Sequence, residues 1–101
     1  MKPADREQWI LAWLRKRQEL SATKWRVDVL DANFVDMYID ATKATFKPSC
    51  FGAHNCRQLG RDLSRLYTQG RLTRCTAGIS DGLCYQGFPR WVWSYALKEQ
   101  A

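Results

Sequence analysis

Apolar residues recur at helical spacing in three segments of the chain. The first covers about residues 5–20. The second begins near Asp31, and its apolar face is predicted to reach Thr45. The third covers 57–69, where the leucines fall on one side of the helix. These patterns predict three helices that pack on a common core, with five residues buried together: Trp13, Tyr38, Leu59, Leu63 and Leu66.

Polar residues and proline mark the expected helix ends. Asp5 and Gln8 have the spacing of a capping box, which predicts that Asp5 caps the first helix. Asp31 is the expected cap of the second helix, and Pro48 is expected to end it. Asn55 is the expected cap of the third helix, after a connection of about ten residues.

Alternating apolar residues predict three short strands, over 25–29, 72–77 and 90–97. The last two are separated by a loop containing glycines, which is typical of a hairpin. In the last strand four side chains share one face: Trp91, Trp93, Tyr95 and Leu97. Three helices followed by a C-terminal hairpin predict an α+β fold, with residues 1–101 forming one domain.

The third predicted helix carries its charge on the face opposite the leucines. Five residues share that face: Arg57, Arg61, Ser64, Arg65 and Thr68. Asp62, the acidic residue of this segment, falls off the face, so the arginines are expected to form a bare cationic stripe. Guanidinium groups suit phosphates and the O6/N7 edge of guanine, which makes DNA the favoured partner. An anionic protein surface and plain solubility are the alternatives.

The distribution of charge supports an anionic partner. The chain has a formal net charge of +6 and an isoelectric point near 9.4. Residues 47–101 contain eight basic and three acidic residues, whereas residues 21–46 contain three basic and four acidic ones. No apolar run reaches the length of a signal peptide or a membrane span, so the sequence predicts a cytoplasmic protein with no membrane partner.

Cysteine and carboxylate side chains give weaker signals. The cysteines are either free thiols, the favoured reading, or ligands of a zinc ion: Cys50, Cys56, Cys75 and Cys84. Their spacing is wider than the pairs typical of zinc sites. Asp36 and Asp40 read as a solvated acidic face. With one histidine and no evident nucleophile–base pair, the sequence predicts no enzyme and no cofactor.

Two readings apply to the tryptophans of the last strand. Trp91 and Trp93 could stack on unpaired bases, as aromatic platforms do. Packing against the first helix, where Trp9 and Trp13 lie, is the favoured reading.

The order helix, short strand, helix, helix, hairpin resembles the winged helix-turn-helix domain over about residues 5–97. Its small size is similar to that of compact bacterial or phage regulators. The resemblance implies that the third helix enters the major groove and that the hairpin, the wing, touches the flanking backbone. It assigns Arg57, Gln58, Arg61, Ser64, Arg65 and Thr68 to the recognition helix, and Arg71, Arg74 and Arg90 to the stem of the wing.

The sequence therefore predicts a small basic DNA-binding protein that regulates transcription or another DNA transaction on double-stranded DNA. The alternative is an interaction module that docks its basic surface on an acidic protein, such as a phage-encoded antagonist of a host complex. That module would use the neutral hairpin tip, residues 80–86, which has no Lys or Arg.

Overall fold

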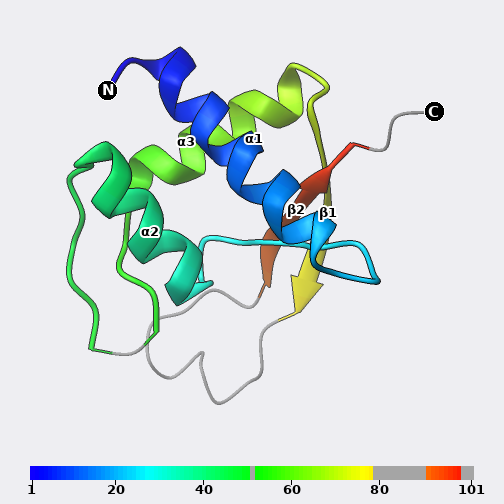
Figure 1. The fold of residues 1–101 in the computed structure, drawn as a ribbon. Helices are drawn as coiled ribbons and strands as arrows, with labels where there is room; N and C mark the ends of the chain where they lie inside the picture. The colour runs from blue at the N-terminus through cyan, green and yellow to red at the C-terminus, as the bar shows by residue number, and fades with distance from the viewer. Residues whose placement is uncertain (51, 79–90, 99–101) are drawn as a thin grey trace.

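Three helices and an antiparallel hairpin make up the described part of the chain. The computed structural model describes residues 1–50, 52–78 and 91–98. The elements follow in the order α1 (Pro3–Glu19), α2 (Ala32–Thr42), α3 (Arg57–Thr68), β1 (Leu72–Gly78) and β2 (Trp91–Leu97) (Figure 1). β1 pairs with β2 from Leu72 opposite Leu97 to Gly78 opposite Trp91. The predicted α+β class, with three helices before a hairpin, is confirmed.

Helix α1 begins earlier than predicted, at Pro3. Proline suits the first helical position because it lacks an N–H that would otherwise be unpaired there. The N-cap is Lys2, which makes no side-chain capping bond, and Asp5 lies inside the first turn. The predicted Asp5 cap is therefore wrong, although a carboxylate in the first turn still suits the helix dipole.

Helix α2 begins as predicted and ends early. The side chain of Asp31 accepts a 3.1 Å hydrogen bond from the backbone N–H of Phe34, which confirms it as the cap. The helix ends at Thr42 because Lys43 adopts a left-handed conformation with φ 57°. Thr45 is thus outside the helix and exposed, and Pro48 does not set its end.

The strand predicted over 25–29 is reduced to a single bridge. Val27 and Tyr95 exchange two backbone hydrogen bonds, of 2.9 and 2.7 Å, along the edge of β2 that β1 leaves free. Arg26 reinforces this pairing: its Nε donates to Ser94 Oγ at 2.9 Å, and a terminal nitrogen donates to the Ser94 carbonyl at 2.7 Å. The segment before α2 is therefore fixed to the hairpin.

The core lies where the three helices meet the inner face of the hairpin. All five residues expected to be buried are buried, and the leucine face of α3 is fully so. Other members come from each element, among them Ile10, Leu14, Phe34, Leu72 and Tyr95. The amphipathic pattern of 57–69 thus identified the correct inner face of α3. Within the described ranges, no helix is long and apolar enough to cross a membrane.

The tryptophans pack differently from the prediction. Trp13 lies against Phe34 of α2, with 4.7 Å between ring centroids, and Trp9 stacks on the same ring. Trp93 is half-buried at the margin of the core, but Trp91 is 50% exposed. The favoured reading, in which both rings of β2 cover α1, is therefore wrong for Trp91.

Candidate nucleic-acid interface

The outer face of α3 is open to solvent because its leucines hold the opposite face in the core. Arg57, Arg61, Ser64 and Thr68 are all exposed on this outer face. Arg57 is the first residue of the helix, and Arg61 follows one turn later, about 6 Å along the axis. Neither guanidinium forms a hydrogen bond or an ion pair with another described residue. These two arginines are the part of the predicted stripe that is free to bind an anion.

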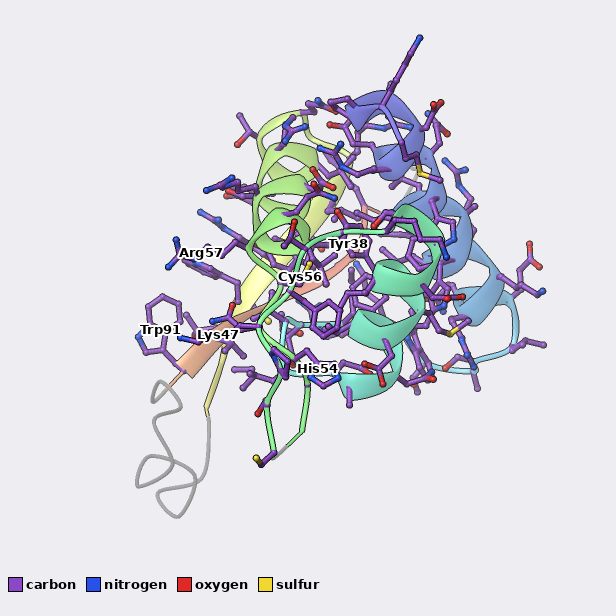
Figure 2. All side chains as sticks on the ribbon, turned by 90° about the vertical axis from the view of Figure 1, so that its left-hand side faces the viewer. Tyr38, Lys47, His54, Cys56, Arg57 and Trp91 are labelled. Atoms are coloured by element: carbon purple, nitrogen blue, oxygen red, sulfur yellow. The ribbon has the colours of Figure 1, made fainter. Side chains whose placement is uncertain are left out.

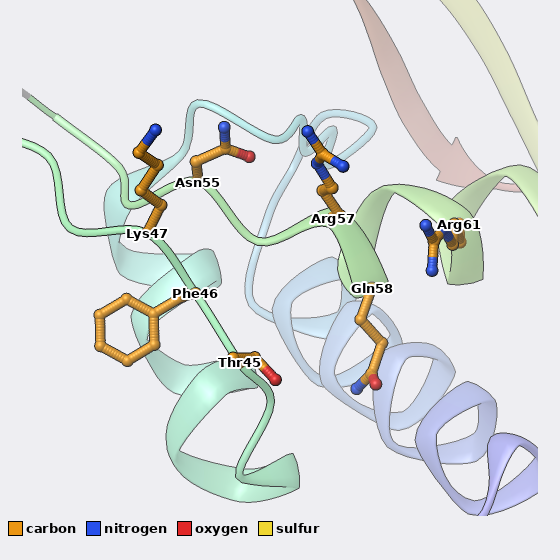
Figure 3. A pocket seen from close by; sticks show the side chains of 7 residues that line it. All are labelled: Thr45, Phe46, Lys47, Asn55, Arg57, Gln58 and Arg61. Carbon is orange, nitrogen blue, oxygen red and sulfur yellow. The ribbon is translucent and has the colours of Figure 1, made fainter.

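Lys47 joins the two arginines at a concavity of about 400 Å³. Figure 2 shows Lys47 and Arg57 on the same side of the molecule. In Figure 3 the charged ends of Lys47 and Arg57 point in the same direction, whereas Gln58 points the opposite way and Arg61 lies one turn further along the helix. Seven described residues line it: Thr45, Phe46, Lys47, Asn55, Arg57, Gln58 and Arg61. Three of them are cations, and none is a carboxylate. We call Lys47, Arg57 and Arg61 the cationic triad.

The connection between α2 and α3 places Lys47 in the triad. Lys47 and Asn55 form an isolated bridge, with backbone hydrogen bonds of 2.8 and 2.9 Å. This pairing folds the connection back and brings Lys47 beside the start of α3. The backbone N–H and carbonyl of Asn55 are both used in this pairing. The N-cap of α3 is Cys56, whose side chain makes no capping hydrogen bond. The predicted Asn55 cap is therefore wrong. The sequence did not identify Lys47 as a site residue, because no local pattern predicts the bridge between Lys47 and Asn55.

Arg65 does not belong to a bare stripe. Its guanidinium contacts Glu7 Oε1 at 3.3 Å and Asp62 Oδ1 at 3.2 Å, and its side chain is 39% exposed. Gln58 also turns inward, because its Nε2 donates a 3.0 Å hydrogen bond to the hydroxyl of Tyr38. The expectation that all the arginines of this helix face solvent without partners therefore fails at Arg65.

A buried carboxylate organises the inner side of α3. Asp62 is fully buried and accepts hydrogen bonds from Arg6 Nε at 2.9 Å and from the Tyr38 hydroxyl at 2.5 Å. The bond to Asp62 raises the pKa of Arg6, and burial, followed by the same carboxylate, raises the pKa of Tyr38. This network ties α1 and α2 to α3 and fixes the orientation of its outer face.

At the stem of the hairpin, Arg74 is held between two aromatic rings. Its guanidinium carbon lies 3.9 Å from the centroid of Tyr67 and 4.0 Å from that of Trp93. Stacking of this kind fixes the plane of the guanidinium and leaves its charge in place. Arg71 is half-buried at the start of the stem. Arg90 and the tip, residues 80–86, lie outside the described residues.

The described cysteines are free thiols: Cys50 and Cys75 are exposed, and Cys56 is buried. In the described part of the chain, no three His, Cys, Asp or Glu side chains are grouped so that they could hold a metal ion. The zinc alternative also needs Cys84, which lies outside that part, and it stays a prediction.

Chemically, this surface can bind a polyanion. The cationic triad supplies charge on one side of α3, and Arg74 supplies a fixed guanidinium on the hairpin side. Compared with known proteins, the chain matches no family model, no curated protein and no solved structure.

Proposed function

We propose that this chain is a small winged-helix DNA-binding protein that regulates transcription or another DNA transaction. In this proposal α3 lies in the major groove, and the stem of the hairpin, through Arg74, lies on the flanking backbone. The cationic triad binds phosphates beside the groove, and Ser64 and Thr68 face the base edges. Arg65 is held by Glu7 and Asp62. It adds to the positive electrostatic potential of the surface and to the rigidity of the helix, and it makes no direct contact with DNA.

One observation carries the proposal: three cations line one concavity at the start of α3, with no carboxylate among its described lining residues. A solvated protein surface usually mixes positive and negative side chains, and each cation there is stabilised by a nearby anion. Like charges kept together without a partner are the electrostatic footprint of a nucleic-acid site.

The arrangement of elements supports the same proposal. The hairpin follows α3 directly, so that Arg74 on β1 lies against Tyr67 at the end of the helix. The bridge from Val27 to Tyr95 fixes the chain before α2 along the free edge of the hairpin. This order of helices and strands is compatible with the winged-helix resemblance, in which helix and hairpin act as one surface.

The test is the salt dependence of binding to a labelled random-sequence duplex, measured by fluorescence anisotropy. If each member of the triad and Arg74 neutralise one phosphate each, affinity should fall roughly 150-fold between about 50 and 200 mM monovalent salt. Arg57→Ala/Arg61→Ala should bind more weakly and lower the magnitude of the log–log slope by about two. Arg15→Ala/Lys16→Ala, which removes two exposed cations from α1, is the matched control for net charge.

Two results would overturn the proposal. One is the absence of duplex binding at the lower salt concentration. The other is an equal loss of affinity in both double variants, because binding would then depend on total charge and not on this surface. Circular dichroism of each variant checks that the helices are retained.

A further inference from the structure

A second concavity, of about 410 Å³, lies between α3 and the aromatic face of the hairpin. Its floor includes Gly60 and Ser64 of α3, and its wall includes Arg74, Trp91 and Trp93 of the hairpin. Its described lining contains no carboxylate. The volume falls within the range of sites that hold small planar ligands. We call it the aromatic concavity.

The wall of this concavity presents flat surfaces. Trp91 is 50% exposed and meets Trp93 edge-on, with 5.1 Å between centroids and 84° between planes. This geometry leaves Trp91 available to a further ring. Beside it, the guanidinium of Arg74 lies over the ring of Trp93. Both faces of that guanidinium are already covered, by Tyr67 and Trp93, so the surface open to a base is the ring of Trp91. Proteins bind unstacked bases on exposed aromatic rings of this kind.

Position 60 of α3, on this floor, has no side chain. A glycine inside a helix destabilises it relative to alanine. Packing does not require glycine here: an added Cβ would lie 4.0 Å from Val29 Cγ1, an ordinary van der Waals contact. Gly60 thus lowers helix stability with no packing reason within the described structure, and it lines the same concavity as Trp91.

We propose that the aromatic concavity receives one unpaired nucleobase of a DNA strand whose neighbouring phosphates lie on the cationic triad. Figure 2 shows Trp91, Lys47 and Arg57 extending to the same side of the molecule, so one strand can reach both sites. This inference rests on the proposed function and narrows it: the preferred substrate is duplex DNA next to a single-stranded segment. Arg74 supplies the cation that favours a strand over an uncharged apolar ligand.

The experiment compares a labelled duplex with the same duplex carrying a short thymine extension that contains one 2-aminopurine. The extended duplex should bind about 5- to 150-fold more tightly, the gain expected from stacking one base. Emission of 2-aminopurine should fall on binding, because stacking quenches it. Trp91→Ala should abolish both effects, because it removes the ring on which the base stacks. Trp91→Phe should retain both.

The variants separate this inference from the proposed function. Equal affinity for the two DNAs, or quenching that persists in Trp91→Ala, overturns the base site. Duplex binding that still depends on salt and on Arg57 and Arg61 would leave the proposed function standing.

Discussion

The hydroxyl of Tyr38 donates a 2.5 Å hydrogen bond to the buried carboxylate of Asp62 and thereby ties α2 to the inner side of α3. Arg6 reaches the same carboxylate from α1, at 2.9 Å. The helix that presents Arg57 and Arg61 to solvent is therefore held from behind by both other helices. Rigid support of this kind reduces the entropy lost when a surface binds its ligand.

Removal of the Asp62 carboxylate should destabilise the fold strongly. In Asp62→Ala the guanidinium of Arg6, whose side chain is 13% exposed, and the hydroxyl of Tyr38 would lose their partner. Breaking a buried ion pair on one side typically costs about 3–5 kcal/mol. Urea unfolding followed by circular dichroism measures the loss. Asp40→Ala is the control, because that carboxylate is 89% exposed and its change should stay below about 1 kcal/mol. Equal effects in the two variants would contradict the role of the network.

Stability should decline in alkaline solution partly through Tyr38. Burial raises its pKa above the ordinary tyrosine value of about 10, so the folded protein holds this proton more tightly than the unfolded chain does. The contribution of the protonated Tyr38 hydroxyl to the free energy of unfolding is complete below about pH 10. It is lost as the pH rises from there toward the pKa of Tyr38 in the folded protein. The difference in unfolding free energy between the native protein and Tyr38→Phe should shrink by up to about 1.4 kcal/mol per pH unit in that window. A difference independent of pH would contradict this prediction.

The sequence predicted what depends on periodicity. The spacing of Leu59, Leu63 and Leu66 identified both the inner face of α3 and the exposed position of Arg57 and Arg61, because a helix fixes where each side chain points. Asp31 was identified as a cap because its bond to Phe34 is local, within three residues.

The sequence could not predict what depends on contacts between distant segments. Arg65 has the same spacing as Arg57 and Arg61, but it pairs with Asp62, three residues earlier, and with Glu7, 58 positions away. Only the contact with Glu7 is beyond the reach of a local pattern. Lys47 enters the cationic triad only because a bridge folds the α2–α3 connection back. Trp91 and Trp93 alternate like core residues, but Trp91 lies at the last described pair of the ladder, opposite Gly78, and is 50% exposed.

Lys47 should contribute one phosphate contact. Lys47→Gln keeps the side chain polar and of similar length but removes its charge. It should weaken duplex binding and lower the magnitude of the log–log salt slope by about one. Lys43→Gln is the matched control: Lys43 lies four residues earlier, is exposed, and is not part of the concavity. Anisotropy titrations at several salt concentrations give both slopes. An unchanged slope in Lys47→Gln would remove Lys47 from the interface.

The geometry of Arg74, rather than its charge alone, should matter for duplex binding. Tyr67 and Trp93 fix the guanidinium plane from two sides, at 3.9 and 4.0 Å, and the fork can then meet a phosphate without losing further side-chain entropy. Lysine keeps the charge but has no planar fork to stack between the rings. Arg74→Lys should therefore lose most of the affinity that Arg74→Ala loses, whereas a charge-only contact predicts that lysine restores nearly all of it. Anisotropy titrations of the three proteins against one duplex decide between these outcomes, and near-ultraviolet circular dichroism should report the loosened packing around Trp93 in both variants. Full binding by Arg74→Lys would show that the aromatic clamp serves stability and not the DNA contact.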